Sequence, residues 1–138
     1  MNRSLFKKLA AMRVVEAQVL LNHRNYCGAY YLAGYAIECA LKACIASKTK
    51  RYDFPDRQFV AKCYTHNIKD LAALAGLEEE RKQLERADSN FAVNWAIVKD
   101  WDETKRYVHT VSRQQARELI TSITEPDSGI MQWLQKHW

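Results

Sequence analysis

The segment from Cys27 to Ala46 constrains the fold of this chain more than any other, because it is apolar or small on almost every side. Its alanines, leucines and isoleucines recur with helical spacing and not with the alternation of a β-strand. A helix that is apolar all round must be covered by neighbours, either in a protein core or in a bilayer. Its length suits a membrane span, but Glu38 and Lys42 interrupt it. We therefore predict a central core helix over residues 26–48.

One face of this helix departs from the apolar pattern. Four polar or aromatic residues follow one another at spacings of three or four, so they share that face. We call them the polar stripe: Tyr31, Tyr35, Glu38 and Lys42. Two interpretations are open. In the first, Glu38 pairs with Lys42 and the tyrosines bridge core and water; in the second, the stripe binds a ligand.

Helical spacing of apolar residues recurs along the rest of the chain. It predicts helices over residues 3–22, 78–99 and 112–124, with a loop over 49–56. Another helix should start at a Thr65 cap and end at Gly76, and a last short helix should start at Asp127 or Ser128.

The first of these helices carries an apolar face that we expect to point into the core. Its members are Leu5, Leu9, Met12, Val15 and Val19. Glu16 falls inside this face, so we expect a neighbouring helix to supply a cation for it. With no strand pattern or repeat in 138 residues, the sequence predicts one all-α domain over 1–138. The simplest architecture is an up-and-down bundle of four to five helices with one short inserted helix.

The net charge and the spacing of the cysteines indicate which kinds of ligand we expect this chain to bind. Lys and Arg number 21 and Asp and Glu 16, a net charge of +5 that favours anionic partners such as RNA or nucleotide phosphates. The four cysteines lack the paired spacing of a zinc site, so we interpret them as small buried apolar residues. No secretory pattern precedes the first helix. We expect a cytoplasmic protein without metal, cofactor or membrane association.

Several segments, taken in order, resemble one known family. They are the run Ala29 to Ala43, Tyr64-Thr-His-Asn67, Asn94-Trp95, Trp101 and Arg106-Tyr107. Together they resemble prokaryotic single-domain HEPN proteins, a family named for nucleotide binding in higher eukaryotes and prokaryotes. The resemblance implies a bundle of four or five helices that commonly dimerises and serves nucleotide or RNA chemistry. Some members are metal-independent ribonuclease toxins, and others bind or neutralise minimal nucleotidyltransferases encoded beside them.

The chain departs from the nuclease motif of that family, in which His follows Arg after four to six intervening residues. The nearest cases here are Arg106 and His109, with two residues between, and Arg57 and His66, with eight. His and Arg still suit metal-free RNA cleavage, because His can take the 2′-OH proton while a cation holds the phosphate. If residues 106–109 are helical, Arg106 and His109 share a face; His66 can reach the site from another helix.

Three hypotheses follow. The leading one is a HEPN-type protein that binds nucleotide or RNA phosphates, as a homodimer or beside a nucleotidyltransferase, in a toxin–antitoxin setting. Its expected ligand-binding residues are Tyr31, Tyr35, Glu38, Lys42, Asn94 and Tyr107. The alternative is a metal-independent ribonuclease that uses Arg106 with His109 or His66. A module that only neutralises a partner enzyme shares every feature. All site assignments assume that Arg106-Tyr107 lies beside the polar stripe.

Overall fold

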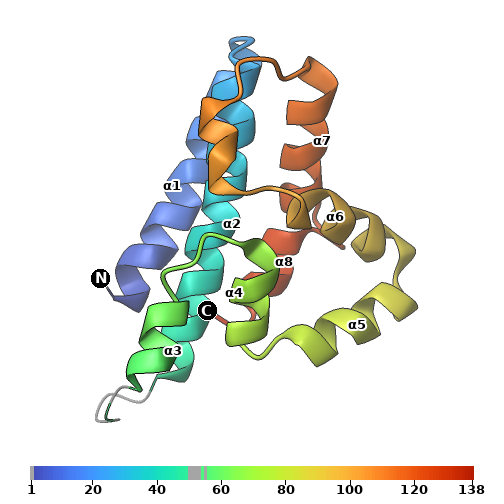
Figure 1. Ribbon diagram of the computed structural model, residues 1–138. Coiled ribbons are helices and arrows are strands. Elements are labelled where there is room, and N and C mark those ends of the chain that lie inside the picture. The colour runs from blue at the N-terminus through green and yellow to red at the C-terminus, as the bar shows by residue number, and fades with distance from the viewer. Residues whose placement is uncertain (1, 50–53, 55) are drawn as a thin grey trace.

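The computed structural model describes residues 2–49, 54 and 56–138, and every regular element in them is a helix (Figure 1). The elements are α1 (Arg3–Asn22), α2 (Tyr26–Lys48), α3 (Arg57–Lys62), α4 (Ile68–Leu74), α5 (Glu78–Ala87), α6 (Ser89–Lys99), the 3-10 helix η1 (Glu103–Tyr107), α7 (Arg113–Thr124) and α8 (Ile130–Gln135). The all-α prediction is confirmed. The described helices outnumber the four to five expected because several are short and one predicted helix is split in two.

The central helix is α2, as the sequence predicts. Helices α1, α4, α7 and α8, together with η1, all contact it, and most of its residues are buried. At Gly34 the ring of Trp101 lies so close that an added Cβ would stand 2.2 Å from it. Trp101 is itself 1% exposed, so this contact fixes the chain that enters η1 against α2.

The predicted helix over 78–99 is in fact two helices, α5 and α6, which meet at Asp88. Asp88 has an extended backbone (φ −138°, ψ 104°), and its Oδ1 accepts hydrogen bonds from the backbone N–H groups of Asn90 and Phe91. Its Oδ2 accepts from the hydroxyl of Ser128, 40 residues further along the chain. This capping from a distant segment turns the chain where sequence periodicity alone continues the helix.

Smaller differences concern the caps. Asn67, and not Thr65, caps α4, and Gly129 stands at the start of α8 in place of Asp127 or Ser128. Gly76, at φ +72°, ends α4 as predicted. Of the predicted loop over 49–56, residues 50–53 and 55 lie outside the described part of the chain.

The predicted inner face of α1 is wrong for four of its five members, because only Leu9 packs against the core. The side of α1 that faces the bundle carries Ala10 and Ala17, which are buried, and the partly buried Leu9, Val14, Leu20 and Leu21. Small side chains on both helices let their backbones pack closely at the two alanines. Glu16 is 42% exposed, and its cation is Arg13 of the same helix, at 2.7 Å, and not a neighbour.

Candidate functional site

The aromatic half of the polar stripe is a stack of rings. Tyr31 and Tyr35 lie with ring centroids 6.2 Å apart and planes 11° apart, and Tyr31 also contacts Trp101 at 5.9 Å. On the other side, the guanidinium of Arg13 lies over the ring of Tyr35, 5.9 Å from its centroid. The stripe is therefore bordered by a cation from α1 and by an indole from the segment before η1.

The polar half is built on a buried carboxylate. Glu38 is 2% exposed, and its Oε1 accepts a hydrogen bond from Lys42 Nζ at 2.9 Å. The same oxygen lies 2.8 Å from Nδ1 of His66, which precedes α4. The pairing of Glu38 with Lys42 agrees with the first interpretation of the stripe. The approach of His66 adds a third polar group from a distant segment.

Glu38 also determines which ring nitrogen of His66 carries a proton. An ionised carboxylate only accepts hydrogen bonds, so Nδ1 must carry the proton that it shares with Oε1. When the imidazole is neutral, Nε2 is left as an acceptor, and the ring is 46% exposed. Oε2 of Glu38 is buried without a hydrogen-bond partner among the described residues, so this carboxylate can accept one more donor.

Burial controls the ionisation of the neighbouring groups. It raises the pKa of Tyr35 above 10.0, with the nearby Cys39 and Glu38 adding to the effect. It also raises the pKa of the Cys39 thiol to about 11, again reinforced by Glu38. Both groups are therefore neutral near pH 7. Cys39 is an inert, buried thiol, and Tyr35 keeps a hydroxyl that can donate a hydrogen bond.

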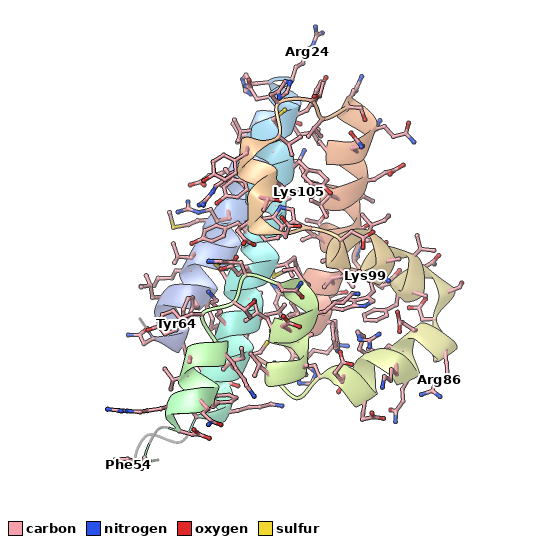
Figure 2. All side chains as sticks on the ribbon, in the orientation of Figure 1. Arg24, Phe54, Tyr64, Arg86, Lys99 and Lys105 are labelled. Atoms are coloured by element: carbon pink, nitrogen blue, oxygen red, sulfur yellow. The ribbon has the colours of Figure 1, made fainter. Side chains whose placement is uncertain are left out.

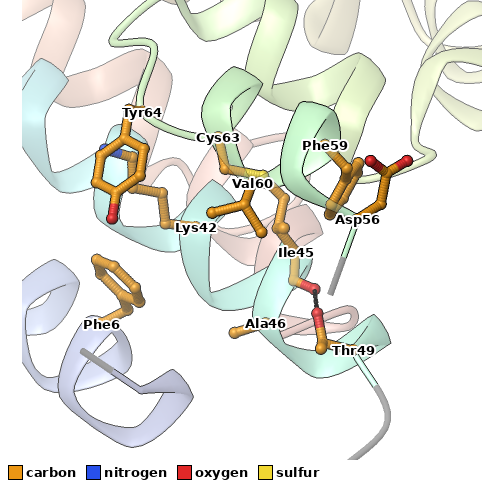
Figure 3. A pocket seen from close by; sticks show the side chains of 10 residues that line it. All are labelled: Phe6, Lys42, Ile45, Ala46, Thr49, Asp56, Phe59, Val60, Cys63 and Tyr64. Atoms are coloured by element: carbon orange, nitrogen blue, oxygen red, sulfur yellow. Dashed lines mark hydrogen bonds between the residues drawn. The ribbon is translucent and has the colours of Figure 1, made fainter. Parts of the chain in front are cut away.

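An apolar pocket of about 290 Å³ adjoins Lys42 between α1, α2 and α3 (Figure 3). Its walls are Phe6, Lys42, Ile45, Ala46, Thr49, Asp56, Phe59, Val60, Cys63 and Tyr64. Figure 3 shows the Lys42 ammonium beside the ring of Tyr64, with Phe6 facing them from α1. A cation at the edge of an aromatic pocket is an arrangement that suits a ligand with a flat apolar body and an anionic group.

The Arg106-Tyr107 dipeptide lies on η1, which packs against α2. In Figure 2, Lys105 marks η1 over the upper part of α1 and α2, while Tyr64 is labelled lower down, beside the upper end of α3. Arg106 stacks on the ring of Tyr107 at 4.8 Å, and both are exposed. Within the described residues, neither side chain forms a hydrogen bond or ion pair with the polar stripe. The link between them runs through Trp101, which contacts Tyr31.

Arg106 and His109 do not share a helical face. Helix η1 ends at Tyr107, and Val108 follows with an extended backbone (φ −80°, ψ 127°), so His109 lies outside the helix. The condition for pairing them at a spacing of three is therefore not met. His109 is exposed in the connection to α7.

Asn94 lies elsewhere. Its side-chain amide donates to the carbonyl oxygen of Ser128 at 3.0 Å, which joins α6 to the connection between α7 and α8. The structure thus brings Asn94 to Ser128 and Asp88, a contact between helices, and not to the polar stripe.

Two features beside the polar stripe, the cation Arg13 and the aromatic pocket, were not predicted from the sequence. Arg13 over Tyr35 depends on how α1 is aligned against α2, and no local spacing signals that alignment. The aromatic walls of the pocket come from α1, from α3 and from the turn after α3, and only Tyr64, inside the Tyr-Thr-His-Asn segment, stood near a predicted site residue.

The described part of the chain holds neither a candidate metal site nor a candidate membrane span. Across residues 2–49, 54 and 56–138, no three His, Cys, Asp or Glu side chains are grouped as metal ligands. None of the helices described combines the length and apolar character that a bilayer crossing requires. Comparison of the chain with protein-family models, with curated proteins and with solved structures finds no match in any of the three.

Proposed function

We propose that this chain binds the phosphates of a nucleotide or of a short single-stranded RNA on the side that carries the polar stripe. The observation that supports the proposal most directly is the shared Glu38 oxygen, which holds Lys42 and His66 side by side next to an aromatic pocket. Buried carboxylates that fix cations in this way preorganise them, so less side-chain entropy is lost when an anion binds.

The ligand phosphate contacts Lys42 and His66 in this proposal. The ammonium of Lys42 has three N–H donors, and one of them serves Glu38. A base or ribose then lies in the pocket of about 290 Å³ against Phe6 and Tyr64. Stacking of bases on aromatic rings is worth about 1–3 kcal/mol per base and tolerates any base identity.

A longer RNA has room to continue along α2. Lys42 lies eleven positions after Tyr31, which is about 16 Å of helix. Beyond Tyr31, the exposed pair of Arg106 and Tyr107 offers a further cation and ring. The excess of positive charge favours such a polyanion. In the cell, a second copy of the chain or a nucleotidyltransferase is the protein partner that we propose, in a toxin–antitoxin setting.

Fluorescence anisotropy of a labelled RNA octamer, at about 50 and 200 mM salt, tests this proposal. Lys42→Gln should weaken binding roughly tenfold and reduce the salt slope by about 0.7, the value for one lost contact with a single strand. Lys82→Gln is the matched control, because Lys82 is half-exposed on α5, far from the stripe in the chain. Absence of saturable binding at low salt, or equal losses for both variants, would remove the proposal.

A second candidate function has its own observation in favour, the hydrogen bond between Glu38 and Nδ1 of His66. In RNA cleavage, Nε2 of His66 takes the proton of the 2′-OH, and the 2′-oxygen attacks phosphorus. The bond from phosphorus to the 5′-oxygen of the next nucleotide breaks, that oxygen takes a proton from solvent water, and a 2′,3′-cyclic phosphate remains. Lys42 stabilises the charge on the phosphate. Arg106 and His109 are the other predicted catalytic residues.

Cleavage of RNA in EDTA, with detection of the cyclic phosphate, decides between binding and catalysis. His66→Asn should abolish cleavage if this candidate is right, whereas His23→Asn, at an exposed histidine after α1, should leave it unchanged. Cleavage that survives replacement of His66, His109 and Arg106 by Ala would come from a contaminating nuclease.

A further inference from the structure

The outward face of α1 carries a row of exposed apolar side chains. We call it the outer stripe; its members are Leu5 (39% exposed), Met12 (51%), Val15 (64%) and Val19 (51%). Their spacings of seven, three and four residues align them along one side of the helix. They span 15 residues, and the first and last lie about 21 Å apart along the helix.

This distribution is the reverse of what a helix on the surface of a monomer carries. The residues of α1 that are buried against the bundle include two alanines, Ala10 and Ala17, while a leucine, a methionine and two valines face water. Isolated exposed apolar residues are common, but several large ones aligned on one face of a helix mark an interaction surface.

The sequence of the outer stripe is arranged symmetrically about Met12. Seven residues before Met12 is Leu5, and seven after it is Val19. Four residues before Met12 is Lys8, and four after it is Glu16. A two-fold axis perpendicular to the helix at Met12 places a second α1 antiparallel to the first. Leu5 then lies at the level of Val19 of the other copy, and Lys8 at the level of its Glu16.

From this pattern we propose that the outer stripe is the interface between two copies of this chain, packed as antiparallel α1 helices about Met12. The occupant is a second copy because the surface is complementary to itself in both apolar character and charge. Two Lys8–Glu16 contacts flank a central apolar contact, and no like charges meet at these levels. Glu16 is 42% exposed and therefore accessible to the lysine of the partner.

The proposed interface also borders the polar stripe. Arg13 pairs with Glu16 at 2.7 Å and at the same time lies over the ring of Tyr35. Contact between Glu16 and a second copy therefore acts on the cation beside Tyr35. The dimer itself does not depend on the RNA or nucleotide binding proposed above, since the outer stripe and the Glu38 cluster share no residue.

Sedimentation velocity between about 1 and 500 µM tests the interface, because one helix pair gives an interface at the small end of the specific range, below about 1,200 Å². The wild-type chain should shift from monomer to dimer over this range. Met12→Glu places two carboxylates at the axis and should weaken association at least tenfold. Val93→Glu, at an equally exposed apolar residue of α6, is the matched control and should dimerise as the wild type does.

A charge exchange makes the test specific for register. Lys8→Glu alone and Glu16→Lys alone each give a homodimer with two like-charge contacts, so each variant should be weakened. A one-to-one mixture of the two variants restores both opposite-charge contacts and should dimerise close to wild-type strength. A wild-type chain that stays monomeric at the highest concentration, or a mixture that associates no better than its components, would overturn the proposal. Circular dichroism checks that every variant is folded.

Discussion

Replacement of Gly34 by Ala tests the packing that joins the segment before η1 to the central helix. A Cβ built at Gly34 stands 2.2 Å from three ring atoms of Trp101, well inside any real contact distance. Trp101 is 1% exposed and also contacts the ring of Tyr31. The ring cannot rotate away without leaving both neighbours, so the added methyl group must displace it.

Two opposing effects set the magnitude. Within a helix, Ala is more favourable than Gly by about 1 kcal/mol. Displacement of a buried tryptophan loses much of its packing, and truncations of buried Phe or Trp cost about 3–5 kcal/mol. Gly34→Ala should therefore lower the free energy of unfolding by about 2–3 kcal/mol, and the melting temperature by roughly 6–9 °C for a domain of this size.

Gly28→Ala is the control within the same helix. Its Cβ would meet only Leu20 Cδ1, at 3.2 Å, the end of a flexible side chain. We expect its free energy of unfolding to stay within about 0.5 kcal/mol of wild type or to rise. Urea unfolding followed by circular dichroism measures both variants. If Gly34→Ala is as stable as Gly28→Ala, the close contact of Trp101 with α2 is refuted.

Three further predictions concern the polar groups. Glu38→Gln should lower the free energy of unfolding by about 1–3 kcal/mol in urea, because it removes a buried charge from its two partners, and an unchanged value would contradict the buried network. Burial raises the pKa of Cys39 and of Cys44 to about 11, so neither thiol of the folded protein should be alkylated quickly at pH 8. The contribution of the two protonated thiols to the free energy of unfolding is complete below about pH 9 and is lost as pH rises toward 11. Partial burial alone would raise the pKa of Glu80, but hydrogen bonds from His137 and from the indole of Trp133 hold it below its usual 4.5. The ionised Glu80 therefore stabilises the fold above pH 4.5, and this stabilisation is lost as pH falls through the pKa of Glu80 in the folded protein. Glu80→Gln should flatten that acid limb in thermal melts.

The central helix was predictable because its signal is local. An apolar run with helical spacing and a four-residue polar face is visible in any window of α2, and the structure gives it the expected bounds. The break at Asp88 was not predictable in the same way. Its cap is completed by the Ser128 hydroxyl, 40 residues away, and the apolar spacing of Phe91 and Trp95 continues past it.

The inner face of α1 could not be chosen from its own sequence. Both sides carry large apolar residues, and the close approach of α2 selects the side on which Ala10 and Ala17 lie among them. Part of the candidate site was accessible: spacing alone aligned Glu38 with Lys42. His66 was named as a group that can reach the site from another helix, but it lies in the connection before α4. Its position on the Glu38 oxygen, and that of Asn94 on Ser128, depend on tertiary packing that no local pattern contains.

The most direct test of the proposed binding site is an amide chemical-shift titration of the labelled protein with a short single-stranded RNA. We expect the shifted amides to cluster at residues 31–42 of α2 and at 64–67 beside His66, and to move in a saturable, salt-dependent way. Shifts confined to α5 and α6, or no shifts at RNA concentrations in the millimolar range, would contradict the assignment of this face as a phosphate-binding surface.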